Sequence, residues 1–414
     1  MKLLIVGSGG REHAMAWKAA KNPKVDCIYC APGNGGTAME DKCKNLSITD
    51  IKALAEFAAH EGIDLTIVGP EEPLIKGIQD AFKKQGLRCF GPSARAATLE
   101  GSKVYSKAFM ERYGVKTAEY KSFNEVTKAR EYLKECSYPT VIKADGLAAG
   151  KGVYICQDAY EADHAIDEIM VQDIFKGAGS EIVIEEYLEG VEASILSITD
   201  GQTIIPFISA KDHKQIYEGG KGPNTGGMGV IAPNPYVTEE VMEAFNRDIL
   251  EPTLRGIQAE ELDYTGIIFF GIMITKKGVY LLEYNVRMGD PETEAVLPLM
   301  KTDLVELIEA ALDKRLKKFK LEWKDDFSCA VIGASKGYPA AYEKGYAISI
   351  GEGPAEKVFI AGGSIKDGQL VTSGGRVLCA TALGENKEEA YEKAYEAMKC
   401  IDFEGMYYRK DIGK

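Results

Sequence analysis

Short apolar runs alternate with helical patterns over the first 100 residues of the chain. Each run is typical of a strand and ends in a loop rich in glycine and proline. The runs are Leu3–Val6, Cys27–Tyr29, Leu65–Val68 and Arg88–Phe90, and helical segments between them include His13–Lys21 and Ile51–Glu61. This alternation predicts a parallel, doubly wound sheet whose ligands bind beyond the carboxyl ends of the strands. We expect all four loops at that edge of the sheet.

From Gly101 onward the pattern predicts smaller α+β units. Helices are expected at Ser102–Tyr113, Asn124–Cys136 and Asp158–Met170, with strands at Pro139–Lys143, Gly152–Cys156 and Glu181–Leu188. Strands and hairpins are then expected from Val191 to Trp323, notably Gly266–Thr275 and Val279–Asn285, followed by helices Thr302–Leu312 and Lys387–Lys399. We predict four domains, with bounds 1–100, 101–190, 191–325 and 326–414.

Composition and charge narrow the class of protein. The 414 residues are 45% hydrophobic and 27% charged, which excludes wholesale disorder. A net charge of −13 disfavours nucleic acid and anionic membranes as partners. The longest apolar stretch, Gly266–Ile274, is too short to span a bilayer, and Met1-Lys2 leads straight into a strand. Nine scattered cysteines do not form a disulfide framework, so we expect a cytoplasmic protein.

The first loop, Gly7-Ser-Gly-Gly-Arg-Glu12, turns from a strand into a helix. Free backbone N–H groups at such a helix start suit a phosphate. The dinucleotide fingerprint needs a glycine where Glu12 stands, so a phosphate monoester with Arg11 as its charge partner is the better interpretation. A tight turn with no ligand remains the alternative.

A second glycine-rich segment, Lys143-Ala-Asp-Gly-Leu-Ala-Ala-Gly-Lys-Gly152, joins two predicted strands. It lacks the spacing and the Ser/Thr of a Walker loop, and it leads to a strand instead of a helix. A glycine-rich hairpin with two lysines can still fold over a triphosphate. We favour that function over an ordinary surface hairpin.

The strongest local pattern lies at Tyr280–Glu294, where Glu283, Asn285 and Arg287 alternate on one face of a predicted strand. Two oxygen ligands followed by a guanidinium indicate a site for magnesium, phosphate and carboxylate groups. A solvated strand face is the alternative, but the rest of the strand is apolar enough to be buried.

Two further segments add polar groups. Glu185–Glu192 leaves a strand with clustered acids that could bind ribose hydroxyls or form an exposed acidic turn. Lys211–Lys214 and the loop Gly222–Gly229 suit a small anionic substrate, and His213 is interpreted as structural.

Together these motifs resemble the ATP-grasp ligases, and within them the glycinamide ribonucleotide synthetase family. The resemblance extends from Gly7–Ala14 to Arg409–Gly413 and therefore covers nearly the whole chain. Its most specific motifs are Gly222–Gly229 and Arg287–Glu294, in which Met288 stands where Phe or Leu is expected. The implied fold has an N-terminal Rossmann-like parallel sheet, an ATP-grasp fold with a small mobile lid, and a small β-rich C-terminal domain.

The implied reaction joins glycine to 5-phosphoribosylamine at the expense of ATP, giving glycinamide ribonucleotide, ADP and phosphate in purine biosynthesis. The resemblance implies Mg²⁺ or Mn²⁺ on Glu283 and Asn285, and catalytic roles for Lys143, Asp212, Arg287 and Asp290. It implies ATP contacts at Lys103, Lys143, Gly146, Gly150, Lys151, Gly152, Glu185, Glu186, Tyr187, Leu188 and Glu192. It implies substrate contacts at Gly9, Gly10, Arg11, Asn34, Asp212, Asn224, Gly226, Gly227 and Arg287.

Three other functions stay open on the sequence alone. They are an ATP-grasp ligase with a different amine acceptor, a nucleotide-binding regulator without activity, and a nicotinamide dehydrogenase. Intact charges at Lys143, Glu283 and Arg287 disfavour the regulator, and Glu12 disfavours the dehydrogenase. We expect small-molecule substrates as the only ligands, and a monomer, with a weak dimer as the alternative.

Overall fold

A five-stranded parallel sheet forms the N-terminal part of the computed structural model, which describes residues 1–147 and 152–414. Its order is β3-β2-β1-β4-β5, which confirms the predicted doubly wound arrangement. The strands are β1 (Lys2–Gly7), β2 (Cys27–Pro32), β3 (Cys43–Asn45), β4 (Leu65–Val68) and β5 (Cys89–Phe90). Helices α1 (Gly10–Ala20), α2 (Ile51–Glu61), α3 (Glu71–Ile75), α4 (Ile78–Lys84) and α5 (Ala94–Gly101) connect or follow them.

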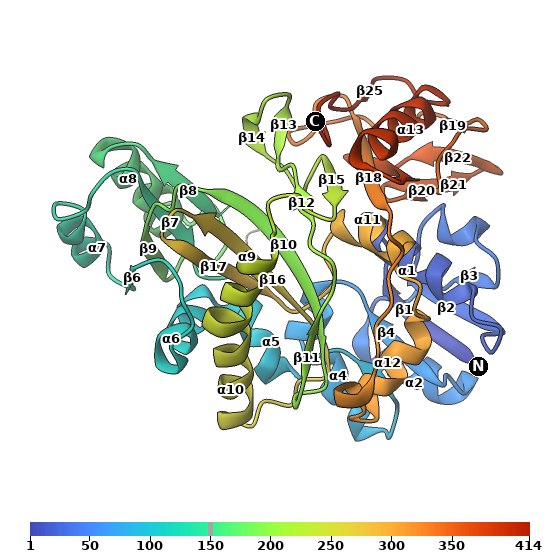
Figure 1. Cartoon of the computed structure of the whole chain (residues 1–414), viewed down its shortest axis with the longest axis horizontal. Helices are drawn as coiled ribbons and strands as arrows, with labels where there is room; N and C mark the ends of the chain where they lie inside the picture. The colour runs from blue at the N-terminus through green and yellow to red at the C-terminus, as the bar shows by residue number, and fades with distance from the viewer. Residues whose placement is uncertain (148–151) are drawn as a thin grey trace.

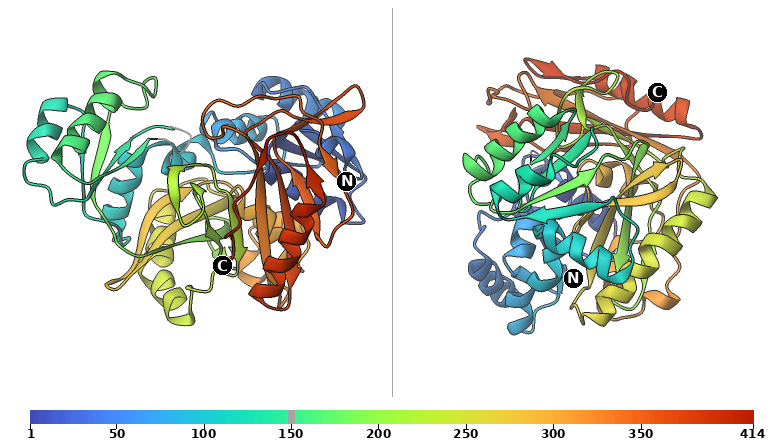
Figure 2. Two further views of the ribbon diagram at one scale, coloured as in Figure 1. Left: turned by 90° about the horizontal axis from the view of Figure 1, so that it is seen from above. Right: turned by 90° about the vertical axis from the view of Figure 1, so that its left-hand side faces the viewer.

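A lid subdomain, defined here as β6 to β9, projects from the rest of the molecule (Figure 2). Its antiparallel sheet has the order β6-β9-β7-β8, with β6 (Tyr120–Phe123), β7 (Thr140–Ala144), β8 (Val153–Cys156) and β9 (Ile182–Glu186). Helices α7 (Val126–Tyr132) and α8 (Ala159–Ile166) cover it and enclose a separate hydrophobic core. Two chain passages join it to the body, and the Glu186 N–H donates to the Glu119 carbonyl at 2.9 Å where they run side by side.

The central body contains an antiparallel sheet of order β11-β10-β16-β17 (Figure 1). Its strands are β10 (Val191–Thr199), β11 (Ile204–Pro206), β16 (Gly266–Thr275) and β17 (Gly278–Asn285). Helix α6 (Lys103–Tyr113) and the helices α9 (Glu239–Phe245) and α10 (Glu251–Ala259) pack on it. For residues 191–301 the sequence predicted strands and hairpins and no helix, so α9, α10 and α11 (Glu292–Leu299) are additions to that prediction.

A six-stranded antiparallel sheet dominates the C-terminal part, with the order β12-β15-β18-β23-β20 and β25 paired to β18. The strands are β12 (Lys211–Asp212), β15 (Gly229–Ala232), β18 (Phe327–Ser335), β20 (Lys357–Ile360), β23 (Arg376–Gly384) and β25 (Met406–Tyr407). Helices α11 (Glu292–Leu299), α12 (Leu304–Leu312) and α13 (Lys387–Lys399) pack around it. Strands from both sides of the boundary predicted near residue 326 share this sheet, because β15 pairs with β18.

Smaller two-stranded sheets complete the secondary structure. They are β13 (Gln215–Tyr217) with β14 (Lys221–Asn224), β19 (Ser349–Ile350) with β24 (Ile401–Asp402), and β21 (Gly363–Lys366) with β22 (Gln369–Thr372). In the part of the chain that the structure describes, no helix is both long and apolar enough to cross a membrane.

The contact between α6 and α10 generates a stability prediction. A Cβ added at Gly256 of α10 would lie 2.3 Å from the Phe109 ring of α6, so the helices approach too closely for a side chain there. We expect Gly256→Ala to lower the free energy of unfolding by about 1–3 kcal/mol through overpacking. Urea denaturation measures this change.

The matched control is Gln258→Ala, an exposed position on the same helix, which should change stability by less than about 0.5 kcal/mol. In an exposed helix position, replacing glycine by alanine stabilises by about 1 kcal/mol. A Gly256→Ala protein about 1 kcal/mol more stable than wild type would therefore show that the helices separate without cost.

Candidate active site

A buried chain of charges lies beneath the lid subdomain. Glu185 of β9 accepts from Lys143 of β7 at 2.8 Å through one carboxylate oxygen and from Lys107 of α6 at 3.1 Å through the other. Burial opposes ionisation of Glu185, but the charges of Lys143 and Lys107 together lower its pKa. Burial also lowers the pKa of Lys107 to about 8, although Glu185 pairs with it. Lys143 Nζ also lies 3.5 Å from the Leu282 carbonyl, beside Glu283 of β17.

The glycine-rich segment begins at the same place. The Lys103 Nζ donates to the Gly146 carbonyl at 3.4 Å, and the Asp145 carboxylate accepts from Ser102 Oγ and from the Val104 N–H at the start of α6. The segment is therefore anchored to the helix that carries Lys103. Gly152 re-enters the structure next to β8, whereas the predicted contacts Gly150 and Lys151 lie outside the described residues.

Glu283 faces several cations without pairing directly with any one of them. Burial raises its pKa, but Lys214, Lys143, Lys103 and Arg287, in this order of influence, lower it below the ordinary value. Asn285 lies two positions after Glu283 in β17 and is buried. Its Oδ1 accepts a hydrogen bond from Arg287 at 3.1 Å. The alternation predicted for this strand thus places both oxygen-bearing side chains in the cation cluster.

The Glu283 and Asn285 side chains offer the oxygen ligands that a magnesium or manganese ion prefers. A carboxylate held ionised and an amide oxygen are hard donors, which such ions prefer. Among the described residues, no group of three or more His, Cys, Asp or Glu could hold a metal by itself. A metal here would take its other ligands from substrate phosphates and water, as Mg²⁺ commonly does.

Arg287 crosses from the end of β17 to the N-terminal sheet. Its guanidinium donates to Glu71 at 3.2 Å and lies 3.3 Å from Glu100. Burial raises the pKa of Glu100 despite the charge of Arg287, and Glu100 also accepts the Val286 N–H at 2.6 Å. The predicted loop edge of the N-terminal sheet, where Glu71 follows β4, therefore faces the proposed metal strand.

The passage after β9 carries the remaining predicted ATP contacts. Glu186 and Tyr187 are exposed, Leu188 is half-buried, and Glu192 is exposed and pairs with Lys214 at 2.8 Å. Burial lowers the pKa of Lys214, but Glu192 and then Glu283 raise it well above the ordinary value.

Carboxylates interact with the backbone N–H groups at the start of α1. The Gly9 N–H donates to Glu12 at 2.6 Å, and Arg11 Nε donates to the other Glu12 oxygen at 2.6 Å. Burial opposes ionisation of Asp290, but Arg376, Arg11 and the Arg11 backbone N–H lower its pKa. Glu12 and Asp290 thus interact with the Gly9 N–H and with Arg11, the groups that the sequence assigned to a phosphate. The phosphate contact of Arg11 stays a prediction.

Asn34 ties the loop after β2 to two other segments. Its Nδ2 donates to the Ser8 carbonyl at 2.9 Å and to the Ile360 carbonyl at 2.7 Å, and its Oδ1 accepts the Gly36 N–H. The loops after β1 and β2 therefore meet at the predicted edge, next to the C-terminal sheet and to Gly10 at the start of α1.

The loop Gly222–Gly229 lies against a second group of acids. A Cβ added at Gly227 would lie 2.6 Å from Asp212, whereas Asn224 is exposed and accepts from Gln215 on the β13–β14 hairpin. Burial, followed by the Glu292 carboxylate, raises the pKa of Asp212 well above its ordinary value. Glu294 is fully buried, and its pKa is likewise raised by burial and by Asp290.

Sequence reasoning did not assign several of these charged residues to the site. Lys107 could have been found, because it lies one helical turn after Lys103. Lys214 lies in the segment Lys211–Lys214, and Glu292 and Glu294 lie in the motif Arg287–Glu294, but neither pattern gave these residues an individual role. Glu71, Glu100 and Arg376 come from distant segments and had no local signal.

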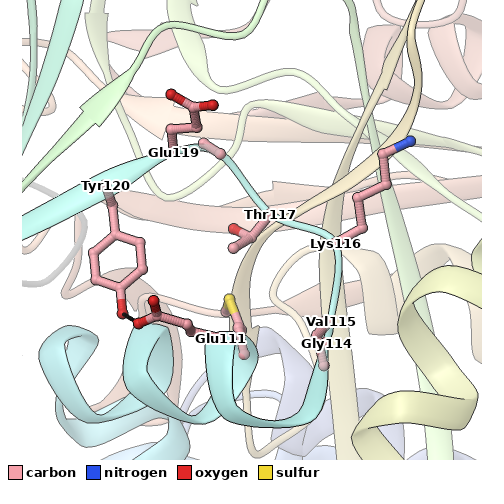
Figure 3. A pocket seen from close by; sticks show the side chains of 9 residues that line it. Glu111, Gly114, Val115, Lys116, Thr117, Glu119 and Tyr120 are labelled. Carbon is pink, nitrogen blue, oxygen red and sulfur yellow. Dashed lines mark hydrogen bonds between the residues drawn. The ribbon is translucent and has the colours of Figure 1, made fainter.

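A surface pocket of about 620 Å³ lies between the end of α6 and β6 (Figure 3). It is lined by residues 110–111 and 114–120, and the Tyr120 hydroxyl donates to Glu111 at 2.9 Å across it. Its lining includes none of the predicted site residues. One of its residues, Thr117, accepts from Lys107 at 2.7 Å and so connects the pocket wall to the buried charges.

Sequence models of one family match this chain in three consecutive parts. The N domain of phosphoribosylglycinamide synthetase matches residues 1–100, its ATP-grasp (A) domain residues 101–293, and its C domain residues 328–414. The chain belongs to the phosphoribosylglycinamide synthetase family. The family resemblance inferred from the motifs is thereby confirmed.

Individual relatives agree with this family assignment. A phosphoribosylamine–glycine ligase of Clostridium acetobutylicum is 62% identical over 414 residues, covering 100% of both chains. The crystal structure of phosphoribosylamine–glycine ligase from Thermotoga maritima has a TM-score of 0.89 at 36% identity and covers 100% of both chains. The biotin carboxylase domain of a Hydrogenobacter thermophilus 2-oxoglutarate carboxylase has a TM-score of 0.74 at 17% identity, covering 98% of this chain and 91% of that one. The last likeness concerns the fold alone, and the predicted ATP-grasp architecture is confirmed by the family model for residues 101–293.

The Lys143–Glu185–Lys107 chain generates a prediction for the family site. Glu185→Gln leaves two buried lysines without their shared counter-charge, so we expect the free energy of unfolding to fall by about 3–5 kcal/mol at pH 7. The folded variant then binds fewer protons than the unfolded chain, so its stability should rise with pH from about 7 to 9. Urea denaturation at several pH values measures both effects.

Glu189→Gln, an exposed acid four residues further on, serves as the control and should change stability by less than about 0.5 kcal/mol. Equal stability of the Glu185→Gln and Glu189→Gln proteins would contradict the shared role of this carboxylate.

Proposed function

We propose that this protein ligates glycine to 5-phosphoribosylamine, forming glycinamide ribonucleotide, ADP and phosphate. The observation that carries the proposal is the convergence of Lys103, Lys143 and Arg287 on Glu283 in a chain that matches the family along its length. Cations that surround a site for a divalent metal are suited to a transferring phosphoryl group. The substrates are small molecules, and a monomeric state and a cytoplasmic location remain predictions from the sequence.

In this proposal Lys103 and Lys143 bind the ATP phosphates beneath the glycine-rich segment. Glu185 and Lys107 hold Lys143 in place, and Glu186, Tyr187, Leu188 and Glu192 border the adenine and ribose. Glu283 and Asn285 hold the metal ion, which neutralises charge on the phosphates when it is bound.

Arg287 orients the glycine carboxylate, which attacks the γ-phosphate and forms glycyl phosphate as the bond to the β-phosphate breaks and ADP leaves. The amine of phosphoribosylamine, held near Gly9, Gly10 and Asn34, then attacks the acyl carbon and phosphate leaves. An acyl phosphate is hydrolysed by water, so a covering lid before the first step has a chemical purpose. No side chain is needed as a nucleophile.

The alternative functions have no comparable support. The nicotinamide dehydrogenase is disfavoured because the first loop has Glu12 where the dinucleotide fingerprint needs a glycine. A regulator without activity has no need for an ionised Glu283 among four cations.

The proposed reaction is tested by ADP release with magnesium-ATP, glycine, and phosphoribosylamine made in place from ribose 5-phosphate and ammonia. We expect ADP only when both substrates are present, together with a product of the mass of glycinamide ribonucleotide. Turnover with another acceptor only, or ATP binding without turnover, would contradict the proposal and leave the fold unchanged.

The metal assignment gives a separate prediction. Glu283→Gln should lower kcat by about 100-fold or more, since it removes a charged ligand at the transferring phosphate. Raising the magnesium or manganese concentration should recover part of the rate, which a titration of ADP release measures. Glu243→Gln, an exposed acid of α9, is the control, and full activity of Glu283→Gln at ordinary magnesium would contradict the assignment.

A further inference from the structure

Arg376, the first residue of β23, reaches from the C-terminal sheet into the site. Its Nη1 donates to the Gly226 carbonyl at 2.7 Å and to the Asp290 carbonyl at 2.8 Å, while its Nη2 lies 2.7 Å from the Asp290 carboxylate. One guanidinium therefore holds two segments that are 64 residues apart in the chain, as their numbers show.

A second residue of the same part of the chain holds Gly226 from the other side. The Gly226 N–H donates to the Tyr338 hydroxyl at 3.1 Å. The Tyr338 ring in turn packs on Gly375, where an added Cβ would lie 2.2 Å from it. Both polar groups of the Gly226 residue are thus bound by side chains that belong to the C-terminal sheet and its loops.

The segment around Gly226, which Arg376 and Tyr338 bind, lies directly against Asp212 and the Asp290–Pro291 turn. Gly227 has a φ of +116°, and a Cβ there would lie 2.5 Å from Pro291 and 2.6 Å from Asp212. The chain can pass between Asp212 and the Asp290–Pro291 turn only with a glycine at this position. A shift of Gly226 would therefore change the contact of Gly227 with Asp212 and the position of the Asp290–Pro291 turn together.

The fork of an arginine is necessary for these contacts. Several N–H groups in one plane reach two carbonyls and a carboxylate at once, which the single ammonium of lysine does not reproduce. Arg376 also lowers the pKa of Asp290 against the effect of burial, and Arg11 acts on this carboxylate in the same direction.

We propose that Arg376, assisted by Tyr338, is a positioning residue that sets the glycine- and amine-binding end of the site, so that the C-terminal sheet completes it. The ATP-binding end is built around Lys103, Lys143 and Glu283 and does not share this dependence. The inference rests on the proposed ligase function.

The test compares the three substrates of the full-length enzyme. For Arg376→Ala we expect kcat/KM for glycine and for phosphoribosylamine to fall by about 100-fold, the loss that a misplacement near 1 Å produces. The KM for ATP should stay within about two-fold of wild type, because the ATP-binding lysines keep their contacts. Guanidinium chloride at low concentration should restore part of the activity of this variant.

Two further variants distinguish a loss of positioning from a loss of folding. Arg376→Lys should lose about 10-fold in kcat/KM for glycine, and Tyr338→Phe, which removes only one hydroxyl, should show a smaller loss of the same kind. The matched control is Lys393→Met. It removes a cation of α13, in the C-terminal part, that pairs with Glu389 of the same helix at 2.7 Å. Its glycine dependence should equal that of wild type.

Each result decides the inference. A glycine-specific loss with guanidinium rescue supports it, whereas unchanged kinetics, or an equal rise of KM for ATP and glycine, overturns it while the ligase function stands. Wild-type enzyme that forms no glycinamide ribonucleotide would contradict the proposed function itself, and this inference with it.

Discussion

Buried charge needs a partner of opposite sign, and this constraint organises the centre of the molecule. An uncompensated ion in the interior costs several kcal/mol, and several cations of the site pair with an acid from a distant segment. Lys107 and Lys143 share Glu185, Arg287 meets Glu71, and Arg376 meets Asp290. These pairs join the lid, the body and both terminal sheets, so folding of each part depends on the others.

The same pairing prepares the site for its chemistry. Several cations together lower the pKa of Glu283, and none of those described forms a direct ion pair with it. Its carboxylate oxygens can therefore bind a metal ion. The lysines lie in buried surroundings, where a charge acts on a phosphate more strongly than in water. At the other end, Asp212 and Glu294 have raised pKa values because burial and neighbouring carboxylates oppose their ionisation. The two ends of the site thus differ: cations favour ionisation of Glu283 at one end, whereas burial opposes ionisation of Asp212 and Glu294 at the other.

Local patterns predicted much of the fold. The bounds of α2, β16 and α13 agree with the ranges expected from apolar periodicity, and the parallel N-terminal sheet follows from the alternation of strand and helix. The prediction failed for α9 and α10, which the sequence analysis passed over in favour of strands. The phosphate expected at the start of α1 stays a prediction. Glu12 and Asp290 lie near the amide groups there, and only Glu12 is close to them in sequence.

By itself, the sequence determined which residues could carry chemistry. Strand alternation places Glu283, Asn285 and Arg287 on one face, and helical spacing places Lys103 and Lys107 one turn apart. Only the tertiary structure decided which acid each cation meets, as when Arg376 of the C-terminal sheet holds Gly226 and Asp290. The physical reason is that periodicity acts within one element, whereas ion pairs between elements depend on how the sheets pack, which no local pattern records.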